Sequence, residues 1–89
     1  MIDFKKYNLN ENDIEFISQL KNDCITCQNE VTLSYDGKSF VLEPRGNAVH
    51  VYAYGKDLGD YESFEDLLLN YKIDEKPLIE IVSKLDYDE

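Results

Sequence analysis

The residues best placed for chemistry are Cys24 and Cys27, which form a C-x-x-C pair. A structural zinc site takes four ligands, commonly two such pairs or one pair with two histidines. The sequence has no second pair, and His50 is its single histidine. A redox-active pair begins a helix, where the thiol pKa falls, whereas this pair follows a predicted helix. We interpret both cysteines as small, partly buried apolar residues, and a metal site of Cys24, Cys27 and His50 is the weak alternative.

His50 is also the one imidazole available as a general base. Hydrolases place a nucleophile beside such a base, and a third group orients it. In the predicted sheet, Ser34 and Ser39 share a face with His50, Val41 lies opposite His50, and Ser39 lies diagonal to it. A flat sheet face offers neither a pocket nor oxyanion donors, so we expect no enzyme. Phosphate-binding glycine loops are absent from the sequence, so we expect no nucleotide or other cofactor.

The acidic residues are concentrated near the end of the chain. The net charge is −10, and residues 60–89 hold ten acids and three bases, which gives −7 of it. Nucleic acids and anionic membranes bind basic patches, so neither is an expected partner. A basic protein would be attracted instead. The acid pairs Glu65-Asp66 and Asp74-Glu75 lie along a helical surface rather than across a cleft, which disfavours catalysis.

The seven tyrosines are the other source of contact residues, because tyrosine offers rigid area and a hydroxyl. Tyr35 and Tyr71 fit the predicted core. Tyr52 and Tyr54 are either core beneath the first helix or an exposed protein-contact patch, and the sequence leaves both interpretations open. The candidate contact residues as a whole are His50, Tyr52, Tyr54, Tyr61, Glu62, Glu65 and Asp66.

The element that precedes the cysteines is a predicted helix over residues 11–22. Asn10 is a suitable N-cap, and Asp13 adds negative charge to the first turn. Ile17 and Leu20 belong to an apolar stripe that should pack against other elements.

The middle of the chain predicts three antiparallel strands. Asp36-Gly37 is typical of a two-residue type I′ hairpin turn. It sets Tyr35 opposite Lys38 and Leu33 opposite Phe40, so the apolar residues collect on one face. We expect a four-residue loop over Pro44–Asn47, which pairs Leu42 with Val49 and Phe40 with Val51. Val49, Val51 and Ala53 then face the core.

The last third predicts two helices. Ser63 caps the first, whose apolar stripe includes Phe64, Leu67 and Tyr71, and Pro77 opens the second, which ends near residue 85. The order α-β-β-β-α-α predicts an α+β two-layer domain over residues 1–89. It consists of a three-stranded antiparallel meander with helices packed on one face. No membrane span or signal peptide is evident, so we expect a cytoplasmic protein.

These features predict a small acidic, non-catalytic protein-binding module that engages a basic protein. Immunity proteins, antitoxins and inhibitors are similar in size and charge only. One alternative is a nucleic-acid mimic, whose carboxylates imitate phosphate spacing and occupy a DNA- or RNA-binding protein. The other is a small metal-binding domain or enzyme. The oligomeric state stays open, because an exposed strand edge can pair with a second copy.

Overall fold

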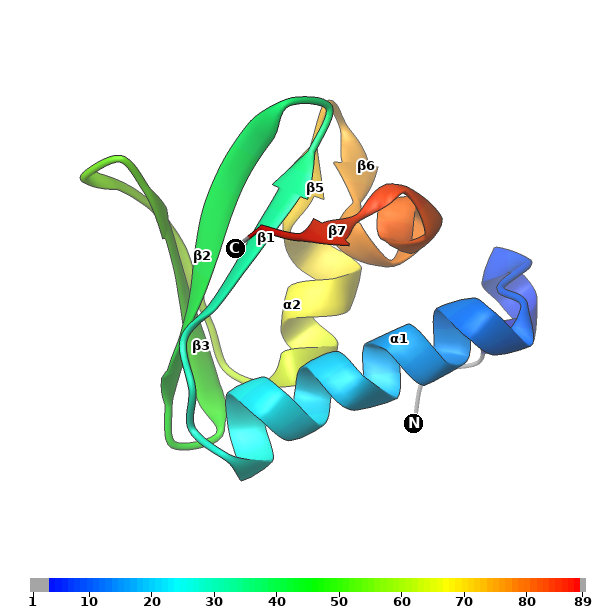
Figure 1. Cartoon of the computed structure of the whole chain (residues 1–89), viewed down its shortest axis with the longest axis horizontal. Helices are drawn as coiled ribbons and strands as arrows, with labels where there is room; N and C mark the ends of the chain where they lie inside the picture. Colours follow the sequence, from blue (N-terminus) through cyan, green and yellow to red (C-terminus); the bar gives the residue numbers. More distant parts are fainter. Residues whose placement is uncertain (1–3, 89) are drawn as a thin grey trace.

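The computed structural model describes residues 4–88 and places an antiparallel sheet beside a layer of helices (Figure 1). The helical segments are η1 (Phe4–Tyr7), α1 (Glu11–Lys21), η2 (Asn22–Thr26), α2 (Phe64–Asn70) and η3 (Leu78–Lys84). The larger sheet has five strands, in the spatial order β4 (Lys56–Tyr61), β3 (Ala48–Ala53), β2 (Lys38–Arg45), β1 (Val31–Tyr35) and β7 (Asp86–Tyr87). A separate hairpin pairs β5 (Lys72–Ile73) with β6 (Lys76–Pro77).

The predicted α+β class and antiparallel sheet are therefore confirmed, but the finer topology is wrong. The order α-β-β-β-α-α lacks β4, β7 and the β5–β6 hairpin, and the meander is larger than three strands. Figure 1 shows α1, α2 and η3 on the same side of the sheet.

The first helix begins where the sequence predicts. The Asn10 side chain accepts a hydrogen bond from the Asp13 amide at 2.8 Å, and the Asp13 carboxylate accepts one from the Asn10 amide at 3.2 Å. This reciprocal pair satisfies two amides that have no partner within the helix. After Lys21 the helix widens into the π-helical turn η2, which carries Cys24 into the core.

The β1–β2 hairpin has the predicted register. Tyr35 pairs with Lys38 and Leu33 with Phe40. Asp36 and Gly37 have φ angles of 51° and 78°, as both central residues of a type I′ turn require.

The predicted loop over residues 44–47 is wrong, because the β2–β3 turn contains only Gly46 and Asn47. Pro44 lies within β2 and pairs with Val49. Its missing N–H is tolerated because β1 begins at Val31, opposite Leu42, so β2 has a single neighbour at Pro44. The register therefore differs from the prediction by two residues.

This shift keeps the predicted facing of β3, because side chains repeat every two residues along a strand. Val49 and Val51 are fully buried, as predicted. Ala53 is partly buried against the same core.

Strand β4 was missed because its residues are mostly charged or glycine. A second turn with two positive φ angles, Tyr54-Gly55, leads into it, and a bulge leaves Leu58 without a partner on β3. The last predicted helix is a 3₁₀ helix, η3, whose three-residue repeat buries Ile79 as well as the predicted Leu78, Ile81 and Val82.

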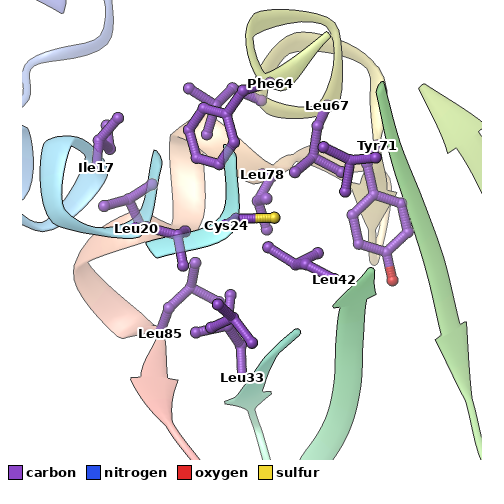
Figure 2. Close-up of a cluster of buried hydrophobic side chains, with 14 of the residues drawn as sticks. Ile17, Leu20, Cys24, Leu33, Leu42, Phe64, Leu67, Tyr71, Leu78 and Leu85 are labelled. Carbon is purple, nitrogen blue, oxygen red and sulfur yellow. The ribbon is translucent and has the colours of Figure 1, made fainter. Parts of the chain in front are cut away.

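The core contains side chains from both the sheet and the helices. In Figure 2, Leu20 and Cys24 lie near Leu33 and Leu42 of the sheet, and Phe64 and Leu67 of α2 close the cluster above. Burial of these side chains accounts for the main stabilising term in a chain of this size.

Candidate functional site: the uncovered face of the sheet

The helices leave one face of the sheet without a covering layer (Figure 1). We call this surface the outer face. Alternation along the strands assigns to it Thr32, Ser34, Ser39, Val41, Glu43, Arg45, His50 and Tyr52, and contacts and pairing add Glu30, Asp57, Asp60, Asp86 and Asp88.

His50 is held between two carboxylates of β4. Its Nδ1 lies 2.6 Å from Asp60 Oδ1, and its Nε2 lies 3.6 Å from Asp57 Oδ1. Only 11% of the side chain is exposed, and the ring stacks on Tyr52 with the centroids 6.0 Å apart. Because an ionised carboxylate only accepts hydrogen bonds, Nδ1 donates to Asp60. Nδ1 therefore has a hydrogen-bond partner in the protein, whereas Nε2 makes only the longer electrostatic contact with Asp57.

Tyr52 is fixed from the other side. Its hydroxyl donates to the Glu30 carboxylate at 2.7 Å, and this hydrogen bond raises the pKa of Tyr52. The hydroxyl therefore stays protonated near neutral pH, and the ring keeps a defined position on the outer face.

Carboxylates dominate the charge of the outer face. Among the residues assigned to the outer face, Arg45 is the single arginine or lysine. It donates a hydrogen bond to Glu43 at 2.9 Å and lies 3.7 Å from Asp60. The carboxylates are Glu30, Glu43, Asp57, Asp60, Asp86 and Asp88. This face therefore offers negative charge around the His50–Tyr52 pair and the partly buried Val41.

The structure separates the predicted contact residues. His50 and Tyr52 lie together on the outer face, whereas Tyr54 is 91% exposed at the tip of the β3–β4 hairpin. Neither Tyr52 nor Tyr54 is buried as core beneath α1. Tyr61 is partly buried, with its ring 5.8 Å from that of Tyr71.

Glu65 and Asp66 of α2, predicted as partner contacts, make hydrogen bonds within the protein. Glu65 accepts a hydrogen bond from Lys21 at 2.6 Å, and this bond lowers the pKa of Glu65. The Asp66 carboxylate accepts hydrogen bonds from the Glu62 amide at 3.0 Å and from the Asn70 side chain. These acids are partly committed to the helix N-terminus and to the contact with α1.

The hydroxyl arrangement expected around His50 is wrong. Glu43, not Val41, lies opposite His50, because the β2–β3 register differs by two residues. Ser39 contacts the carboxylate of Asp88, which follows β7 at the edge of the sheet away from β4. The described contacts of His50 include no hydroxyl or thiol that would act as a nucleophile.

The two cysteines lie in different environments. Cys24 is fully buried, and this burial raises the pKa of its thiol to about 11, whereas Cys27 is exposed. Residues 4–88 contain no cluster of three or more His, Cys, Asp or Glu residues suited to a metal ion, so Cys24, Cys27 and His50 do not form one.

The sequence did not predict that two acids of β4, Asp57 and Asp60, contact His50. A signal was present: Tyr54-Gly55 follows β3 just as Asp36-Gly37 follows β1, and each pair ends in the glycine that a two-residue hairpin turn favours.

Comparison with known protein families, with curated proteins and with solved structures finds no match for this chain. Across the described residues, no helix is long and apolar enough to cross a membrane.

Proposed function

We propose that this protein is a small, non-catalytic binding module that engages a basic protein through its outer face. The observation that carries the proposal is the outer face itself, where Glu30, Glu43, Asp57 and Asp60 lie around an ordered His50–Tyr52 pair and Arg45 is the balancing cation. Asp86 and Asp88 add negative charge at the β7 edge of the same face. Such a surface steers a basic partner and disfavours an acidic one.

Anchoring contacts support the same function. Tyr52 is held by Glu30 and stacked on His50, so it loses little conformational freedom on binding. Tyrosines in such ordered settings are common hot spots of protein interfaces, surrounded by residues that contribute less. The His50 side chain is only 11% exposed and its Nδ1 is held by Asp60, which supports a structural and electrostatic role for this residue.

A pull-down from the native host at two salt concentrations tests this function. We expect a basic protein to be retained at low salt and largely lost at high salt, because exposed charges are screened over about 8–10 Å at physiological ionic strength. Recovery of no basic protein at either salt concentration contradicts the proposal.

Single substitutions separate two modes of binding by the same surface. If Tyr52 anchors the interface, Tyr52→Ser weakens binding more than neutralising any single carboxylate. If the surface acts as a nucleic-acid mimic, the partner is a DNA- or RNA-binding protein, and the loss is spread over many carboxylates. We propose the first mode, because the Tyr52 ring is positioned by two separate contacts.

A further inference from the structure

A cavity of about 270 Å³ lies on the helical side of the sheet, lined by residues of β1, β2, β3, β4 and β5 and by Tyr71. Figure 1 shows β5 and β6 beside the tip of the β1–β2 hairpin. The apolar residues that line it include Tyr35, Phe40, Ala53, Leu58 and Ile73. The volume is slightly below the roughly 300–1,000 Å³ of drug-sized ligand sites, so it suits a short chain or a single ring.

The charge of this cavity is opposite to that of the molecule. Lys38 and Lys56 line it, and no carboxylate does, although the chain has a net charge of −10. Within residues 4–88 neither lysine has an ion-pair or hydrogen-bond partner. Two larger cavities, of about 760 and 520 Å³, both include carboxylates in their walls.

Tyr71 adds a polar group to the same site. Its side chain is 8% exposed, it lines the cavity, and Figure 2 shows its hydroxyl pointing away from the buried apolar cluster. The hydroxyl has no hydrogen-bond partner among the residues that the structure describes, and its oxygen reaches solvent. Burial raises the pKa of Tyr71 to about 12, so the group is a hydrogen-bond donor at neutral pH.

Tyr54 marks the rim of the cavity. It is 91% exposed and has a φ angle of 50°, a left-handed conformation that bulky residues rarely adopt. Asn or Gly would suit this turn position better. An unfavourable backbone conformation that presents an aromatic ring beside a cavity is typical of a ligand-contacting position.

We propose that this cavity binds a small amphipathic anion. Lys38, Lys56 and the Tyr71 hydroxyl hold the anionic group, and the short apolar chain or ring packs against Phe40, Ala53 and Ile73. Of the residues that line this site only Ser39 belongs to the outer face, so the site adds a small-molecule ligand to the proposed protein-binding function.

Titration of the full chain with octanoate, followed by the NMR shifts of the Ala53 and Ile73 amides, tests the proposal. We expect saturable shifts and an affinity at least tenfold higher than for octylammonium or octan-1-ol, which lack the negative charge. Inorganic phosphate, which lacks the apolar chain, should bind at least tenfold more weakly. No saturable shift with octanoate, or equal affinity for any of these controls, overturns the proposal.

Matched variants locate the site. We expect Lys38→Gln with Lys56→Gln to weaken octanoate binding at least tenfold, because both charges are lost. Lys72→Gln with Lys84→Gln makes the same charge change at exposed positions that do not line the cavity, and it should alter binding less than twofold. Tyr71→Phe keeps the buried ring and should weaken binding three- to tenfold. Equal effects of the two lysine pairs overturn the proposal.

Discussion

At the scale of single residues, Tyr54 has the least favourable combination of conformation and exposure. The left-handed backbone conformation of Tyr54 costs an ordinary L-residue about 1–2 kcal/mol of stability, and Asn adopts this conformation more readily. Tyr54→Asn should therefore raise the free energy of unfolding by about 1 kcal/mol. Urea denaturation measures the change. Asp36→Asn, at the equivalent position of the first hairpin, is the control and should change stability by less than about 0.5 kcal/mol. A less stable Tyr54→Asn protein would show that the exposed ring supports the fold.

Cys24 and Tyr71 predict a loss of stability at alkaline pH. Burial raises the pKa of Cys24 to about 11 and that of Tyr71 to about 12, above the ordinary values of 9.0 and 10.0. Between each pair of values the unfolded chain loses a proton that the folded chain keeps, so the free energy of unfolding falls as pH rises. We expect a fall that begins near pH 9 and reaches about 3–4 kcal/mol by pH 11, roughly two thirds of it from Cys24, measured by urea denaturation.

Two controls separate this effect from general charge repulsion. Cys24→Ala should lower stability at pH 7 but flatten its decline between pH 9 and 11. Cys27→Ala should leave the decline unchanged, because Cys27 is exposed. Identical slopes for wild-type protein and Cys24→Ala would contradict the assignment.

At the scale of elements, the N-terminal cap of α1 is a defined source of stability. Asn10→Ala removes the acceptor for the Asp13 amide and should cost about 1 kcal/mol. Asn12→Ala, two residues along the same helix, replaces an exposed side chain with a better helix former and should cause no loss. Thermal unfolding of both variants measures the difference, and equal stabilities would show that the capping box contributes nothing.

The elements also show how much of the fold the sequence could predict. Local signals were reliable: Asp36-Gly37 set the β1–β2 register, and Asn10 and Ser63 cap their helices as predicted. Signals that depend on distant partners failed. Strand β7 has two residues, and its pairing with β1 depends on the position of η3 rather than on a local pattern.

The candidate site was predicted only in part for the same reason. Alternation along β3 correctly placed His50 and Tyr52 on the face opposite Val49 and Val51. The acids around His50 come from β4, whose polar sequence resembles a loop until it pairs with β3. The sequence therefore predicted the aromatic residues of the site without their electrostatic surroundings.

At the scale of the whole molecule, charge and apolar surface are distributed over two sides of one sheet. The helical side holds the buried core and, at one end, the cavity lined by Lys38 and Lys56. The outer face holds carboxylates and the His50–Tyr52 pair. In the proposed function, the net charge of −10 would attract a basic protein over long range, and the outer face would provide the ordered contacts at short range.

The affinity of the recovered basic partner for two charge-matched triple variants tests the central claim most directly. One variant carries Asp57→Asn, Asp60→Asn and Asp86→Asn on the outer face. The other carries Glu15→Gln, Glu75→Gln and Glu80→Gln, at exposed positions outside the outer face. We predict at least a tenfold loss of affinity for the outer-face variant and less than a twofold loss for the control. Equal losses, or a larger loss for the control, would contradict binding through the outer face.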